Sequence, residues 1–140
     1  MKMSARALAA LIASASVPAN AVAVEPPRET VISSLKQPIP SIAGKSLVAS
    51  VVYYRPGAKS PPHRHPAAHL IFAQVLSGAI RSQVNDEPPK VYPAGASWFE
   101  LPGAHHVISE NASSSESAQL LVVFVVDADN RELIAPDPKQ

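Results

Sequence analysis

Residues 57–78 read GAKSPPHRHPAAHLIFAQVLSG, and this stretch decides the fold expected for the whole chain. It holds three of the five histidines, and the remaining two follow a Pro-Gly pair further on; the five are His63, His65, His69, His105 and His106. The neutral imidazole nitrogen is a good ligand for divalent transition metals. Because all five histidines lie in two short segments, the sequence predicts one metal site assembled from two pieces of backbone.

The spacing of His63 and His65 suits a shared metal ion. On a strand, side chains at i and i+2 project from the same face, with Cα atoms ~6.5 to 7 Å apart. A proline precedes His63 and another follows His65, which stiffens the segment and lowers the entropy lost on ordering the two rings. The alternative for an isolated His-x-His pair is a solvated surface pair.

A third ligand must then come from another strand. His105 and His106 are adjacent, so on a strand they face opposite ways and only one of them should enter the site. His69 has the same parity as His63 and His65. It is therefore a candidate extra ligand if the strand continues unbroken.

Two patterns in the chain resemble the motifs of the cupin superfamily. The first motif is resembled by Gly57, followed after five residues by His63-x-His65 and then by Gly78. The second motif is resembled by Gly95, Pro102-Gly103, His106 and Asn111. The resemblance covers residues 48–126. It implies a small antiparallel jelly-roll β-barrel, the double-stranded β-helix, with a metal ion inside held by His63, His65 and His106.

The chain departs from these motifs at two places. The first motif normally has a glutamate seven residues before its closing glycine, where this chain has Ile71; Glu87, Glu100 and Glu110 do not match that position. Without this glutamate a three-His site remains, in which His69 is a candidate to take the place of the glutamate. A site without the glutamate has one negative charge fewer, which would favour anionic or enolate ligands.

The second departure concerns the later histidine pair. Four residues separate His106 from Asn111 where the motif has three, and five separate His105 from it, so His106 is the better match. His105 is then expected beside the site or at its rim. Gln74 is a candidate for a hydrogen bond near the pocket. Trp98 and Phe99 could form an apolar wall, although ordinary core packing is the better expectation for such large side chains.

Closely spaced turns and β-branched runs predict an all-β fold. Strands are expected at residues 46–54, 67–76, 79–84, 90–92, 96–101 and 118–126, separated by Gly and Pro turns, as in an antiparallel sandwich or barrel. The domain organisation predicted is a signal peptide (1–23), an extended proline-rich arm (24–45), the barrel (46–127) and a C-terminal tail (128–140). The arm could pair with a partner's sheet edge in a homodimer.

The N-terminus indicates export. Lys2 and Arg6 precede an uncharged apolar run at residues 7–15 and two Ala-x-Ala cleavage sites, which is the layout of a secretory signal peptide and predicts a periplasmic or secreted protein. The apolar run is shorter than the ~20 residues that a membrane-spanning helix needs. The sequence has no cysteine, so neither a disulfide bond nor a lipid attached to cysteine is expected. A net charge of +1 argues against nucleic acid as a partner.

Three functions are compatible with this pattern. A three-His site can hold Fe, Zn, Ni or Mn, and with Fe(II) it could support a dioxygenase-like reaction on a small anionic or chelating substrate. The alternative is a non-catalytic small-molecule-binding or sensor cupin, because nothing in the sequence marks a nucleophile or general base. A third reading is a structural barrel without metal.

Overall fold

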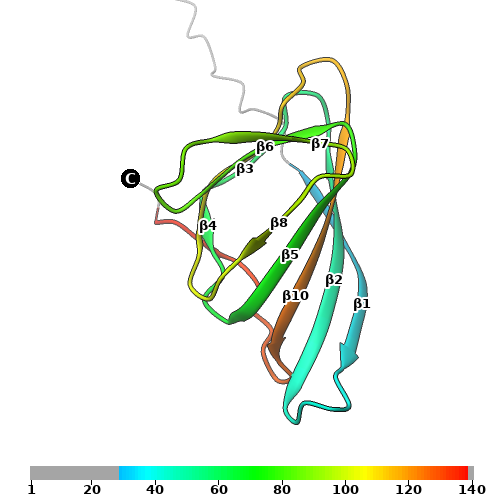
Figure 1. Ribbon diagram of the computed structural model, residues 1–140, viewed down its shortest axis with the longest axis vertical. Coiled ribbons are helices and arrows are strands. Elements are labelled where there is room, and N and C mark those ends of the chain that lie inside the picture. Colours follow the sequence, from blue (N-terminus) through cyan, green and yellow to red (C-terminus); the bar gives the residue numbers. More distant parts are fainter. Residues whose placement is uncertain (1–28, 139–140) are drawn as a thin grey trace, which may run out of the picture.

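Antiparallel strands make up the regular structure of residues 29–138, the part of the chain that the computed structural model describes (Figure 1). In chain order the strands are β1 (Thr30–Pro38), β2 (Lys45–Tyr54), β3 (Lys59–Ser60), β4 (His63–Arg64), β5 (Ala68–Ser77), β6 (Ala79–Val84), β7 (Lys90–Pro93), β8 (Ser97–Glu100), β9 (His105–Asn111), β10 (Ala118–Asp127) and β11 (Ala135–Pro136). Within residues 29–138 there is no helix, and hence none that could cross a membrane. The predicted signal peptide lies outside the described residues.

Two sheets face each other. One has the order β1-β2-β10-β5-β8, and the other has the order β11-β4-β9-β6-β7 with β3 also paired to β9. In Figure 1 the long strands β2, β10 and β5 run side by side, and β4, β6 and β7 lie across from them. Apart from the consecutive pairs β1·β2 and β6·β7, neighbours in each sheet come from distant parts of the sequence, as in a jelly roll. The predicted all-β antiparallel fold is confirmed.

The core lies between the sheets because inward and outward side chains alternate along each strand. On β2, Val52 and Tyr54 are buried while Tyr53 between them is 39% exposed. One apolar cluster includes Val75, Ile80 and Trp98. A second contains Ile71, Phe124 and Val126, together with Val48 and Ala68. These two clusters pack at the inner face of the long strands and leave room beside them for the polar residues described below.

Both terminal segments of the described chain belong to the sheets. The proline-rich arm provides β1, a nine-residue strand that pairs with β2 of the same chain at eight positions, with an irregularity between Ser33 and Leu35. In the predicted C-terminal tail, Ala135 pairs with Arg64 and Pro136 with His63, so the tail returns to β4. These pairings bring residues before 46 and after 127 against the barrel.

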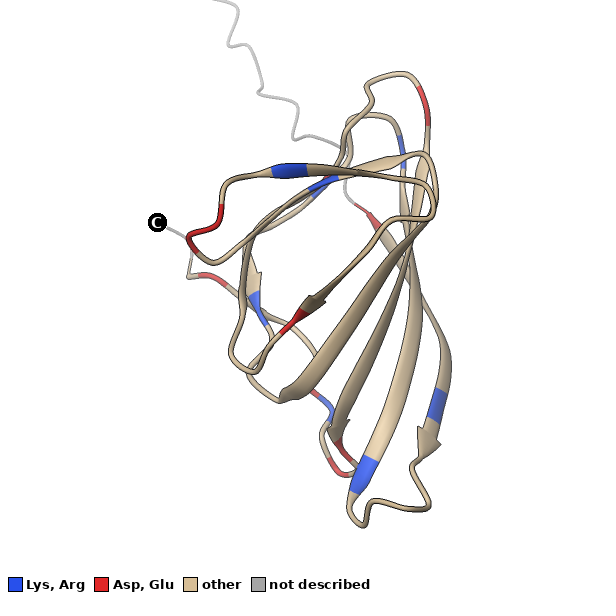
Figure 2. Cartoon of the chain, in the orientation of Figure 1, with Lys and Arg blue, Asp and Glu red and all other residues tan. Residues whose placement is uncertain are grey.

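Charged side chains are spread over the strands and turns rather than gathered on one face (Figure 2). Several of them pair with one another across neighbouring strands. Glu110 on β9, for example, accepts a hydrogen bond from Arg81 on β6 and lies 3.1 Å from the Lys59 ammonium on β3. Such partly exposed pairs each contribute little to stability.

Candidate metal centre

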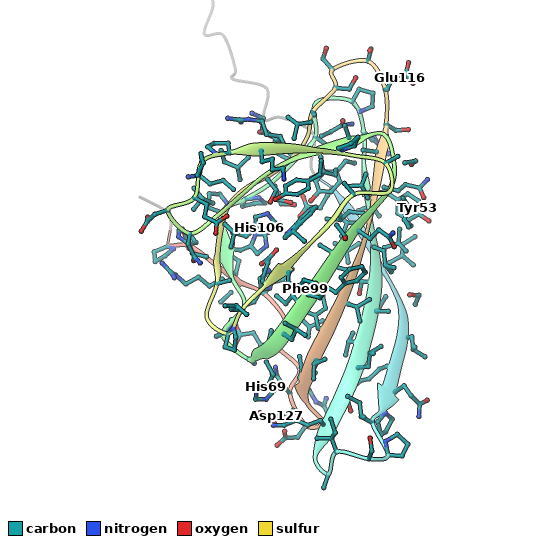
Figure 3. The ribbon with its side chains drawn as sticks, in the orientation of Figure 1. Tyr53, His69, Phe99, His106, Glu116 and Asp127 are labelled. Atoms are coloured by element: carbon teal, nitrogen blue, oxygen red, sulfur yellow. The ribbon has the colours of Figure 1, made fainter. Side chains whose placement is uncertain are left out.

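Three histidines meet in the space between the sheets. His63 lies on β4, His65 directly follows it, and His106 lies on β9, where it is the cross-strand partner of His63. Their ligand nitrogens all lie within 4.8 Å of one another, and all three side chains are buried. Figure 3 shows His106 within the space that the two sheets enclose. The structure thus brings together the three residues predicted as metal ligands.

Hydrogen bonds orient the first two rings. Nδ1 of His63 lies 2.7 Å from the Pro61 carbonyl oxygen, and Nδ1 of His65 lies 2.8 Å from the Leu133 carbonyl oxygen. A carbonyl oxygen can only accept, so each Nδ1 must carry the proton and donate. Burial lowers the pKa of both His63 and His65 and keeps them neutral. Each ring therefore has an unprotonated Nε2, the form that binds a metal ion.

The third ring, His106, is also buried and has a lowered pKa. Burial, and then the proximity of His63 and His65, lowers the pKa of His106 to about 3. Its Nε2 lies 2.8 Å from the Ser82 hydroxyl, a buried group on β6. Its Nδ1 faces the carboxylate of Glu100 at 3.4 Å. The cluster is thus a set of three neutral imidazoles at neutral pH.

A glutamate that the motif comparison set aside lies at this cluster. Glu100, on β8, is 2% exposed, and its Oε1 accepts a hydrogen bond of 3.1 Å from Nε1 of Trp98. Its Oε2 lies 3.6 Å from Nε2 of His65 and has no hydrogen-bond partner. Burial raises the pKa of Glu100. The interpretation that the site lacks a carboxylate therefore needs correction.

The register of β5 and β8 explains why the motif comparison missed Glu100. Ile71 occupies the glutamate position of the motif, and its cross-strand partner is Glu100. Both side chains are buried on the inner face of the same sheet. One signal was available in the sequence, because Trp98 and Glu100 are two apart on a predicted strand and must share a face. The sequence alone did not reveal that the strand carrying Glu100 pairs with the strand carrying Ile71.

The structure places His69 outside the cluster. A turn after His65 separates β4 from β5, so the unbroken strand that the parity argument needed does not exist. The His69 side chain is 45% exposed, and its Nε2 lies 2.9 Å from the Lys45 ammonium and 3.1 Å from Oδ1 of Asp127. Figure 3 shows His69 and Asp127 together, well away from His106. His69 therefore cannot replace the missing motif glutamate.

The two other residues proposed near the site also lie apart from the three rings. His105 points away from His106 on β9, as the alternation of the strand requires, and its Nε2 lies 2.7 Å from Oδ2 of Asp137 in the tail. Gln74 alternates with Ala73 on β5, and it is Ala73 that lines the cavity. His105 is thus a partner of the C-terminal segment, and Gln74 does not face the ligand space.

The two aromatic residues of β8 have different roles. Trp98 is 9% exposed and packs on Tyr92 in the core, with ring centroids 4.4 Å apart. Phe99 is 63% exposed on the opposite face, where Figure 3 labels it, and packs against Phe72. Core packing is therefore the correct description of Trp98, and its indole also holds Glu100. Phe99 forms no part of the cavity wall.

A cavity of about 300 Å³ adjoins the histidine cluster. Much of its wall is apolar, with contributions from Val52, Tyr54, Leu120, Val122 and Phe124. The arm adds Glu29 and Val31, and the C-terminal segment adds Leu133, Ile134 and Pro136. Glu29 and Glu100 both line this space, whereas no Lys or Arg of the described chain does. A metal ion would therefore be the principal positive charge in the cavity.

Comparison with known proteins agrees with this architecture. Among solved structures, a protein with a double-stranded β-helix domain from Klebsiella pneumoniae has a TM-score of 0.59 at 20% identity, covering 80% of this chain and 86% of that one. Oxalate oxidase in complex with glycolate has a TM-score of 0.52 at 22% identity, covering 59% and 43%. A DMSP lyase from Ruegeria pomeroyi has a TM-score of 0.54 at 24% identity, covering 66% and 45%.

This chain spans less than half the length of the last two proteins, and all three likenesses concern the fold. No curated protein sequence matches the chain. The family model described as the cupin domain matches residues 50–124, which is more than half of the sequence and includes all three clustered histidines. The chain therefore belongs to the cupin family.

Proposed function

We propose that this cupin binds one divalent transition metal ion at His63, His65 and His106. The observation that carries the proposal is the orientation of the first two rings: each donates its Nδ1 proton to a backbone carbonyl and so keeps Nε2 free as a ligand. The ligand nitrogens of these three buried, neutral imidazoles lie within 4.8 Å of one another. Among the described residues, no Lys or Arg side chain lines the adjoining cavity to supply a positive charge there. Fe, Zn, Ni and Mn all suit such a site.

The adjoining cavity supports a small ligand with a chelating group and an apolar body. Its aliphatic and aromatic wall would exclude water from the ligand, and the metal ion would hold the chelating atoms. The expected preference for anionic ligands is weakened, since Glu29 and Glu100 bring negative charge to the cavity. We propose a chelating ligand of low charge, such as a diketone-like or hydroxy-carbonyl compound.

A dioxygenase-like reaction with Fe(II) is the catalytic form of this proposal. The ion would supply redox chemistry and sites for oxygen and substrate. The chain's own residues would orient the substrate and keep bulk water out. Oxalate oxidase and the DMSP lyase have different activities on similar folds. The cavity wall, rather than the fold, must then select the substrate.

One observation favours the non-catalytic alternative, a small-molecule-binding cupin. Burial raises the pKa of Tyr54, and its hydroxyl lies 2.8 Å from the hydroxyls of both Ser60 and Ser109. This phenol therefore stays protonated at neutral pH and is suited to orient a ligand rather than to remove a proton.

Metal analysis of the purified chain tests the proposal. The protein is loaded with Fe(II), Zn, Ni or Mn without oxygen, dialysed, and analysed by plasma mass spectrometry; we expect close to one ion per chain. Oxygen consumption by the Fe(II) form with a panel of diketones and hydroxy-carbonyl compounds then separates the oxygenase from the binding protein. If none of the four ions remains bound above the level of a His63→Ala, His65→Ala, His106→Ala triple variant, the metal site is disproved.

A further inference from the structure

Glu100 lies against the histidine cluster, 3.6 Å from His65 and 3.4 Å from His106, although it is on a different strand from the motif glutamate. We propose that Glu100 is the fourth protein ligand of the metal ion, supplied from β8 in place of the residue that β5 lacks at Ile71. This inference rests on the metal site proposed above. It converts the neutral three-His set into a set with three imidazoles and one carboxylate.

The first support is the register between the two strands. Ile71 and Glu100 are direct partners in the antiparallel pair β5·β8, and both side chains point into the barrel. Directly opposite residues on one face of a sheet have Cβ atoms only about 4.5–5.5 Å apart. A glutamate side chain is long enough to span this distance between the two Cβ positions. The carboxylate of Glu100 can therefore reach the space that the carboxylate of a glutamate at position 71 would fill.

The second support is an unpartnered oxygen. Oε2 of Glu100 is buried and has no hydrogen-bond partner, whereas Oε1 is held by the Trp98 indole. A buried carboxylate oxygen without a partner is costly, and such groups are normally paired or bound to a metal ion. The Trp98 bond fixes the carboxylate at the cluster, with Oε2 3.6 Å from Nε2 of His65 and Oε1 3.4 Å from Nδ1 of His106. No Lys or Arg of the described chain lines this space to neutralise it.

The third support is the atom that Oε2 faces. It lies 3.6 Å from Nε2 of His65, which carries a lone pair because Nδ1 of that ring donates to Leu133. Two electron-rich atoms thus face each other in a buried space. A positive charge between them removes the repulsion, and a divalent ion would do this for His65, His106 and Glu100 together. A single proton, in contrast, could bridge Glu100 to His65 or to His106 but not to both.

The decisive measurement is metal affinity in Glu100→Gln. This variant keeps an oxygen for the Trp98 bond and nearly the same volume, but removes the negative charge. Competition with a chelator of known affinity should show at least a tenfold weaker Kd for Zn and Fe(II) than in the unchanged chain. The absorption spectrum of the Co(II)-loaded protein should change as well, because a carboxylate ligand has been lost. Glu110→Gln is the matched control, since that glutamate pairs with Arg81 and Lys59 on the other sheet.

A swap across the strand pair gives an independent test. Glu100→Ile alone should lose metal affinity like Glu100→Gln, and Glu100→Ile combined with Ile71→Glu should recover most of it. Thermal unfolding of the metal-free variants checks that each is folded. Because Glu100→Gln is nearly isosteric, it decides the question even if the double variant does not fold.

The outcomes separate this inference from the proposed function. If the unchanged chain binds metal and Glu100→Gln binds it with the same Kd and Co(II) spectrum, Glu100 is not a ligand while the three-His site stands. Bridging by a proton rather than a metal ion would give that same result. If the unchanged chain binds no metal, the proposed function falls and this inference with it.

Discussion

Ile71 and Glu100 lie directly opposite each other on β5 and β8, and both are buried inside the barrel. A comparison by position along the chain finds isoleucine where a carboxylate is expected. The strand pairing finds the carboxylate one strand away, with its free oxygen facing His65. Chemistry that is missing from one position of a barrel can thus be supplied by its cross-strand partner.

The three clustered histidines should each be needed for metal binding. Replacing one of His63, His65 or His106 by alanine removes an imidazole ligand and should weaken metal binding by well over tenfold. His69→Ala and His105→Ala are the controls, because their rings bond to Asp127 and Asp137 away from the cluster. Metal content after dialysis is the measurement. Loss of metal in His105→Ala with retention in His106→Ala would contradict the observed alternation of β9.

The Trp98 indole should stabilise the buried carboxylate of Glu100. Trp98→Phe removes the hydrogen bond to Oε1, which should cost roughly 1.5–3 kcal/mol and raise the pKa of Glu100 further. Phe99→Leu on the same strand, at a side chain 63% exposed, should change stability by less than about 0.5 kcal/mol. Urea unfolding of the metal-free proteins measures both. Equal stabilities for the two variants would show that the indole bond contributes nothing.

The metal-free protein should lose stability as the pH falls below about 6.5. The pKa of His106 drops from 6.5 to about 3 on folding, so in this window the unfolded chain binds a proton that the folded chain does not. At pH 5 this alone should cost roughly 2 kcal/mol relative to pH 8. His63 and His65, whose pKa values are also lowered by burial, act in the same direction.

Glu100 acts in the opposite direction, because its raised pKa makes the folded chain bind a proton that the unfolded chain releases above pH 4.5. The loss from the three histidines is therefore measured most clearly in Glu100→Gln, which lacks this opposing contribution. Urea midpoints in a chelating buffer at pH 8 and pH 5 check this. A midpoint that is unchanged or higher at pH 5 would show that the three rings are not buried and neutral.

Gly78 should tolerate no side chain. A Cβ built there would lie 2.6 Å from the Ser117 carbonyl oxygen and 2.8 Å from Cβ of Ala118, and the backbone has φ of +70°. Gly78→Ala should therefore destabilise by roughly 2–5 kcal/mol, from backbone strain and overpacking together. Gly95 has φ of +86° but open space, so Gly95→Ala should cost about 1–2 kcal/mol. Thermal unfolding compares them, and equal losses would mean that the close approach at Gly78 is relieved at no cost.

The C-terminal segment should be required for tight metal binding. Ending the chain after Arg131 removes the Leu133 carbonyl that orients His65, the pairing of β11 with β4, and part of the cavity wall. Metal affinity should fall about 10- to 100-fold, as when the group that orients a ligand histidine is lost. Removing only residues 139–140 is the control. Full metal affinity in the longer truncation would show that His65 needs no acceptor for its Nδ1 proton.

The sequence by itself was sufficient for the fold class, most strand positions and the three clustered histidines. These rest on local rules: β-branched runs between Gly and Pro turns form strands, and side chains two apart share a face. The same alternation put His105 and His106 on opposite faces, and the spacing to Asn111 in the cupin motif selected His106. The alternation was wrong for His69, because the turn after His65 resets the parity, and a parity argument holds only within one unbroken strand.

Only the tertiary structure decided what surrounds the three rings. Glu100 reaches them through the register of β5 and β8, and the Leu133 carbonyl reaches His65 from 68 residues away. The register between paired strands and the position of the C-terminal segment depend on many packing contacts between residues far apart in the sequence. A one-residue shift in register would turn every side chain of a strand to the opposite face of the sheet. Local patterns therefore located the ligands, but the carboxylate, the proton positions on the rings and the cavity wall arise from contacts that no local pattern records.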